Sequence, residues 1–190
     1  MHGSHVRAVI YAMRMGTPTS SSFLDKSEIR CLDSLYLDCY SHVASLKRAH
    51  AVAGKWLVAP RFPSALSESI AAQLVPRLFG NNSRPARGPG LQDLMVLPSK
   101  TSLAVKGTGP SRWISLTGTD LEAEGLIWID YSRRLTLGAA TIDVWCFWGK
   151  VGTRAESGKA TLRQLQSRYD GRAKYHRFSI KQLTRESEEK

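Results

Sequence analysis

An acid and a lysine lie near the two ends of a stretch whose pattern predicts a β-hairpin. The stretch DLMVLPSKTSLAVKGTG runs from Asp93 to Gly109, with two short apolar runs around a Pro-Ser-Lys turn. An acid on one strand beside an acid-x-cation triplet on the next can hold Mg²⁺ and steady the charge developing on a phosphate. Because alternate strand residues share a face, residue 104 is expected on the same side of the sheet as Lys106. Position 104, where this chemistry needs a second acid, is Ala104.

Two helices are predicted before this hairpin. Apolar residues recur at three- and four-residue intervals from Ile29 to Leu46, which predicts a long helix beginning at DKSEIR and packing one face on the core. A second helix is expected to begin at Ser64 or Ser67, to carry Glu68 in its first turn and to bend or end near Pro76. The stretch GNNSRPARGPG that follows is predicted to be a loop.

Beyond this loop, short runs rich in Val, Ile, Leu and Trp predict strands. They are DLMVLP, TSLAVK, RWISL, GLIWIDY and TIDVWCFW, with a short helix over TDLEAEG between the third and the fourth. The fold class is therefore α/β or α+β, with a central mixed sheet flanked by helices. We expect a weakly ordered arm over residues 1–24 and one domain over residues 25–190.

The chain from Ser64 to Trp148 resembles the PD-(D/E)xK nuclease superfamily, which has the restriction-endonuclease-like fold. The likeness consists of a helix glutamate (Glu68), a strand acid (Asp93), a strand lysine (Lys106), the strand RWISL, a short helix and GLIWIDY. It implies a Mg²⁺ site formed by Asp93, position 104 and the Val105 carbonyl, supported by Glu68. Lys106 would orient or activate the attacking water.

The sequence departs from that pattern at two positions. Gln92 replaces the proline of the family's name, and Ala104 replaces the second acid. The resemblance implies a Mg²⁺-dependent DNA endonuclease that is nearly inactive as written. Two explanations of Ala104 stay open: deliberate replacement of an acid, or loss or relocation of the ligand in the natural chain. The alternatives are a non-catalytic module on the same fold that binds double-stranded DNA, and a basic interaction protein of unrelated fold.

A rival placement of the acids uses two later strands. Asp130 in WIDYS and Asp143 in TIDVW supply both carboxylates, but Trp145 then stands where the lysine belongs. Carboxylates on the polar edges of two strands explain this pattern equally well, so the rival placement ranks second.

The charge of the chain favours a polyanionic partner. The 27 Lys and Arg residues against 16 Asp and Glu residues give a formal charge of +11, and about half of this excess lies in residues 149–190. In that segment we expect a helix in ESGKATLRQLQSRY, with Arg163 and Arg168 exposed, and a strand in KYHRFSIKQL.

Double-stranded DNA is the expected partner, and a homodimer is one assembly that stays open. The side chains expected to contact DNA flank the proposed site: Lys100, Arg112, Trp113, Arg133 and Arg134.

Other classes of site lack their motifs. The three cysteines are widely spaced without a CxxC pair, which fits a reducing cytoplasm and argues against a zinc site. No GxSxG or phosphate-cradling glycine loop is present, which argues against acyl-transfer hydrolases and P-loop proteins. No apolar run approaches the roughly 18 residues of a spanning helix, so we expect no membrane insertion.

Overall fold

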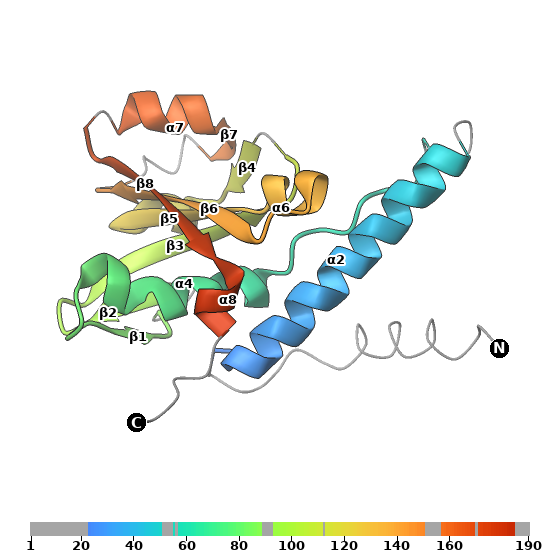
Figure 1. Ribbon diagram of the computed structural model, residues 1–190. Helices are drawn as coiled ribbons and strands as arrows, with labels where there is room; N and C mark the ends of the chain where they lie inside the picture. Colours follow the sequence, from blue (N-terminus) through green and yellow to red (C-terminus); the bar gives the residue numbers. More distant parts are fainter. Residues whose placement is uncertain are drawn as a thin grey trace.

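A six-stranded mixed sheet forms the centre of the protein (Figure 1). The computed structural model describes residues 23–50, 55, 57–88, 93–111, 113–150, 157–169 and 171–184. The strand order is β1-β2-β3-β5-β6-β8. The strands are β1 (Arg84–Ala86), β2 (Leu94–Leu97), β3 (Thr101–Thr108), β5 (Gly125–Asp130), β6 (Thr141–Trp148) and β8 (Ala173–Ser179). The expected α+β class with a mixed sheet flanked by helices is therefore confirmed.

Strands β3 and β5 are the only parallel neighbours among the pairs of the central sheet that the structure describes. The predicted hairpin is present, because β2 and β3 pair antiparallel with Leu94 opposite Leu103. The connection from β3 to β5 passes through β4 (Trp113–Leu116) and helix α5 (Gly118–Glu122). The carboxyl ends of β3 and β5 consequently lie at the same edge of the sheet, and the segments that follow both strands begin there.

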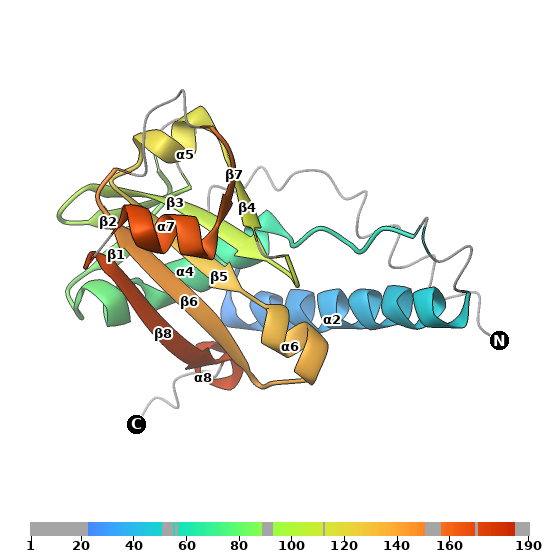
Figure 2. The same cartoon turned by 90° about the horizontal axis from the view of Figure 1, so that it is seen from above.

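The two faces of the sheet carry separate apolar clusters because successive strand residues point to opposite sides. Leu103 and Val105 of β3 face helix α4 (Ser64–Phe79), α2 (Lys26–Ala49) and α8 (Ile180–Thr184). Ala104 faces the opposite cluster, which includes residues of α5, of β4, of β7 (Gly158–Thr161) and of α7 (Leu162–Arg168). Figure 2 shows α7 over one face of the sheet and α4 behind the other.

The strand RWISL does not belong to the central sheet. Its residues form β4, which pairs antiparallel with β7 (Gly158–Thr161) in a second sheet of two strands. At one edge of the central sheet, β1 pairs with β2, although β1 lies inside the stretch predicted to be a loop. Within the C-terminal segment, the expected helix is confirmed only over α7, because the residues before it form β7. The expected strand is confirmed over β8, but its last residues form α8. Arg163 and Arg168 are exposed as expected.

Helix α2 begins where the sequence indicates and projects away from the sheet at its other end (Figure 1). Asp25 accepts a hydrogen bond from the Glu28 amide at 2.8 Å, and Glu28 accepts one from the Asp25 amide, which caps the helix. Only its first half packs firmly, since its buried residues are Ile29, Asp33 and Tyr36. The expectation that this helix packs one face on the core is therefore confirmed for its first half only.

The expected N-terminal arm lies mostly outside the described residues. Its last two residues, Phe23 and Leu24, pack against the main apolar cluster, and the Leu24 amide donates to Ser69 Oγ at 2.9 Å. Of the helices that the structure describes, none is both long enough and apolar enough to cross a bilayer.

Helix α6 (Ser132–Leu137) follows β5 directly at the carboxyl edge of the sheet. The Ser132 hydroxyl donates to the Gly109 carbonyl at 2.9 Å, which joins this helix to the segment that follows β3. The ends of the two parallel strands are thereby tied together beside the candidate site.

Candidate functional site

The structure brings Asp93 and Lys106 together, as strand alternation predicts. The ammonium nitrogen of Lys106 lies 4.0 Å from Asp93 Oδ2. The same Asp93 oxygen accepts a hydrogen bond from the Val105 amide at 2.7 Å. The β2–β3 ladder ends at the pair Leu94 and Leu103, and the Asp93 carboxylate accepts from an amide two residues beyond Leu103. The Asp93 side chain therefore binds a backbone amide of β3 and also places a carboxylate near Lys106.

A second acid lies closer to Lys106 than Asp93 does. Asp120 of α5 places its Oδ1 atom 2.6 Å from Lys106 Nζ, and its side chain is 7% exposed. Its other oxygen accepts hydrogen bonds from the Thr117 amide at 2.7 Å and the Thr117 hydroxyl at 2.8 Å, which caps the short helix. The sequence analysis missed Asp120. The sequence does contain a signal for it, because Thr117 is followed three residues later by this acid, as in a helix capping box.

The carboxyl of Asp93 is held in an unfavourable setting for a charge. Burial raises the pKa of Asp93 above its ordinary value of 3.8, and the nearby Glu68 and Asp120 carboxylates add to the rise. The Val105 hydrogen bond and the Lys106 charge oppose this effect without cancelling it. Three acids therefore lie near enough to influence one another around Lys106.

Ala104 does not open on a cleft. It is 2% exposed and packs in the apolar cluster with Ile114, Leu116 and Leu126. It does share the face of Lys106, since both residues lie on the α5 side of β3. At the position where the resemblance implies part of a Mg²⁺ site, the structure therefore has a packed methyl group.

The acid predicted on the second helix is already paired. Glu68 accepts a short hydrogen bond from the Arg87 guanidinium, which also lies over the Phe23 ring at 4.4 Å. Among the described residues, no three His, Cys, Asp or Glu side chains converge so as to hold a metal ion. Protein donors contact the carboxylates of Asp93, Asp120 and Glu68 in this structure. Mg²⁺ binding stays a prediction.

The rival pair of acids meets across two strands. Asp130 and Asp143 are opposite each other in the β5–β6 register. Asp130 accepts a hydrogen bond from the Ser132 amide at 2.8 Å, while Asp143 accepts from Arg177 at 2.7 Å and from Tyr175 at 2.8 Å. Both carboxylates therefore have structural partners.

The residues expected to contact DNA are separated by the fold. Lys100 is exposed in the β2–β3 turn, at the opposite end of β3 from Trp113 and Arg133, which are also exposed. Arg134 points inward and forms two hydrogen bonds to Asp33 of α2, at 3.0 and 2.5 Å. Its guanidinium is engaged in the structure, so the expectation that Arg134 contacts phosphate is replaced by a structural role. Arg112 lies outside the described residues.

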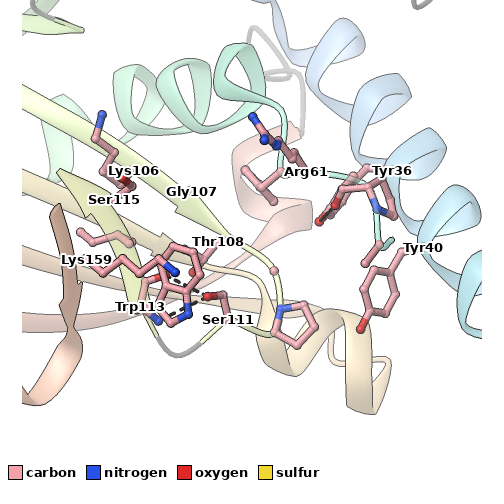
Figure 3. Close-up of a pocket in the computed structure, with 16 residues that line it drawn as sticks. Tyr36, Tyr40, Arg61, Lys106, Gly107, Thr108, Ser111, Trp113, Ser115 and Lys159 are labelled. Atoms are coloured by element: carbon pink, nitrogen blue, oxygen red, sulfur yellow. Dashed lines mark hydrogen bonds between the residues drawn. The ribbon is translucent and has the colours of Figure 1, made fainter. Parts of the chain in front are cut away.

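A groove of about 710 Å³ opens at the carboxyl end of β3, beside Lys106 (Figure 3). One wall is formed by α2 and the segment 59–62, and the other by β4 and β7. Close packing shapes the first wall: the Phe62 ring lies so near Gly107 that a Cβ there would meet it at 2.2 Å. Tyr36 packs edge-on against Phe62, with 5.1 Å between ring centroids.

The groove combines aromatic rings with cations. Arg61 and Lys159 are exposed on opposite walls, and Lys106 lies near its inner end. Lys159 places its ammonium 4.1 Å from the centroid of the Trp113 ring. No carboxylate is among the described residues that line the groove. Such a lining is complementary to a ligand with both negative charge and flat apolar surface.

Sequence reasoning found Lys106 and Trp113 but missed Arg61 and Lys159. These two residues lie about a hundred positions apart in the chain, and only the docking of β7 on β4 places Lys159 beside Trp113. The basic excess of the C-terminal segment was the available signal, although it does not single out one lysine.

Comparison with known proteins adds no relative from which a function could be transferred. No family model matches the chain, and neither a curated protein nor a solved structure matches it. The resemblance to restriction-endonuclease-like proteins consequently depends on short motifs and on the order of elements.

Proposed function

We propose that this protein binds DNA without cleaving it, on a core related to the restriction-endonuclease-like fold. The order of α4, β2 with Asp93 directly before it, β3, α5 and β5 follows the expected order and supports the fold. The expected strand RWISL departs from it, because β4 lies outside the central sheet. The position of Asp93 next to Lys106 supports the same alignment. The double-stranded DNA expected from the charge is the first partner to test.

The groove beside Lys106 is the observation that carries DNA binding. Its cations Arg61 and Lys159 have no carboxylate partner among the described residues, so their charge is available to a phosphate. Phosphate contacts supply most of the affinity of proteins for nucleic acids in general. The overall charge of +11 adds a long-range attraction for a polyanion.

The pairing of the acids is the reason for proposing binding without hydrolysis. Lys106 is held by Asp120 at 2.6 Å, and Glu68 is held by Arg87. A divalent cation at Asp93 Oδ2 would compete with the Val105 amide and the Lys106 ammonium for the same oxygen. Ala104 adds no ligand and is enclosed by apolar side chains.

The test combines a binding measurement with a cleavage measurement. Fluorescence anisotropy with a labelled duplex of about 20 base pairs is recorded from about 50 to 200 mM salt, and log K is expected to fall by roughly 0.9 per phosphate contacted. Supercoiled plasmid incubated with the protein and Mg²⁺ is expected to stay supercoiled. Salt-independent binding contradicts the proposal, and so does absent binding to both this duplex and a single strand of equal length. Nicking that requires Mg²⁺ contradicts the non-catalytic half of the proposal.

Mg²⁺-dependent cleavage of DNA is a second candidate function, favoured by the position of Asp120. This acid is within ion-pair distance of Lys106 and is one of the charges that raise the pKa of Asp93. It therefore offers a relocated carboxylate where Ala104 offers none. If plasmid is nicked, Asp93→Asn and Asp120→Asn must each abolish the activity, and Asp143→Asn must retain it, for this candidate to replace the first.

A further inference from the structure

The exposed Trp113 ring carries a more specific inference about the groove. Trp113 and Ser115 are the exposed residues of β4, and they alternate with the buried Ile114 and Leu116. Trp113 is 41% exposed although it is one of the largest apolar side chains of the chain. Ser111 fixes the backbone at this point, since its hydroxyl donates to the Trp113 carbonyl at 2.9 Å. The ring is thus held at the mouth of the groove.

The register of the small sheet places a cation on this ring. Ser115 lies opposite Lys159 in the β4–β7 pair, so Lys159 is a diagonal neighbour of Trp113 on the same exposed face. Its ammonium lies 4.1 Å from the ring centroid. Figure 3 shows Trp113 and Lys159 together on one wall, facing Arg61 and the tyrosines of α2 across the groove.

This arrangement suits an unpaired nucleotide better than a base pair. Lys159 lies over one face of the Trp113 ring, so a flat base would stack on the other face of the indole. A phosphate flanking that base can attract the Lys159 ammonium. In a duplex the base faces are covered by their neighbours, so the ring cannot reach them unless a base leaves the stack. Arg61 on the opposite wall can pair with the next phosphate along the strand.

We infer that the groove binds single-stranded DNA, with one unpaired base against Trp113 and the adjacent phosphates at Lys159 and Arg61. This inference rests on the proposed function, because it names the form of DNA that the same groove selects. Other anionic ligands that carry an aromatic ring, such as a free nucleotide, are separated from it by the experiment.

The experiment compares two DNA forms and three variants. Anisotropy is measured with labelled oligothymidine of about 12 nucleotides and with a duplex of equal length, at one salt concentration. Trp113→Ala is expected to weaken single-strand binding about tenfold and duplex binding less than about twofold. Trp113→Phe should restore most of the single-strand affinity. Tyr175→Ala is the matched control, because Tyr175 is equally exposed but lies on β8. Thermal unfolding verifies that each variant is folded.

The outcomes separate this inference from the proposed function. If the protein binds both forms equally and Trp113→Ala changes neither, DNA binding stands and the inference is overturned. An equal loss for both forms also overturns it, because the ring then does not select unpaired bases. If the unaltered protein binds neither form, both the proposed function and the inference fail. Displacement of the strand by thymidine monophosphate at similar concentration assigns the groove to free nucleotides and overturns the inference.

Discussion

Lys106 of β3 and Asp120 of α5 form a close ion pair, with 2.6 Å between Nζ and Oδ1. The Lys106 side chain is 24% exposed and that of Asp120 is largely buried, so the pair is shielded from water on one side. Asp93 is the more distant partner, at 4.0 Å. The lysine that resembles a catalytic group therefore also fastens a short helix to the sheet.

Removing Asp120 should destabilise the protein by leaving a partly buried ammonium without its nearest partner. We expect Asp120→Asn to lower the free energy of unfolding by about 3 kcal/mol. Adding Lys106→Met should recover part of this loss, because the uncompensated charge is then gone. Urea unfolding of the two single variants and the double variant measures the coupling between the residues. Strictly additive losses would contradict a direct interaction.

An acid introduced at position 104 should cost stability and create no cleavage. The Ala104 methyl group packs with Ile114 and Leu116, so Ala104→Asp places a carboxylate among apolar side chains. We expect a loss of about 3 kcal/mol in urea unfolding at neutral pH, and a smaller loss for Ala104→Asn, which has similar volume without the charge. Mg²⁺-dependent plasmid nicking by Ala104→Asp that Lys106→Ala abolishes would contradict this expectation and favour a metal site at position 104, as the resemblance implies.

The ionisation of Asp93 should reduce stability as the pH rises. Its pKa is above 3.8 in the folded protein, so between the unfolded and folded values the folded state binds more protons than the unfolded state. Stability from this group is therefore greatest at low pH and declines through that window. Asp93→Asn keeps an acceptor for the Val105 amide and removes the titration. The difference in unfolding free energy between the unaltered protein and this variant, measured from about pH 3 to pH 7, should shift in favour of the variant. A difference that stays constant with pH would show that Asp93 is not perturbed.

Arg134 and Arg133 should behave differently although they are adjacent. Arg134→Ala leaves Asp33 buried without its partner, which is expected to cost about 3 kcal/mol or more. Arg133→Ala changes an exposed side chain and should alter stability by less than about 0.5 kcal/mol. Thermal or urea unfolding distinguishes the two. Equal effects on stability would contradict the structural role assigned to Arg134.

Local signals in the sequence predicted the elements that depend on local contacts. The capping pair Asp25 and Glu28 marks the beginning of α2, and alternation in TSLAVK places Ala104 and Lys106 on one face of β3. The contact between Asp93 and Lys106 followed from the same hairpin. These features involve residues that are close in the chain, where period and turn chemistry decide the structure.

The features that were missed depend on distant residues. The strand RWISL leaves the central sheet because its partner β7 lies more than forty residues later, in a segment predicted to be a helix. Arg134 turns inward because Asp33, 101 residues earlier, is available to pair with it. Neither pairing is encoded in a periodic pattern, so sequence spacing alone could not reveal it.

The central claim is that the groove cations hold DNA, and the most direct measurement is the salt dependence of binding in two variants of equal charge. Arg61→Ala with Lys159→Ala removes the groove cations that have no carboxylate partner among the described residues, while Arg163→Ala with Lys181→Ala removes two exposed cations from α7 and α8. We predict that the groove variant loses about tenfold in affinity. Its slope of log K against log salt should become shallower by about 2, because each of the two lost phosphate contacts accounts for roughly 0.9 of the slope. The control variant should retain the slope of the unaltered protein. Equal losses in both variants would contradict the account, because they would mean that net charge alone, rather than the groove, attracts the DNA.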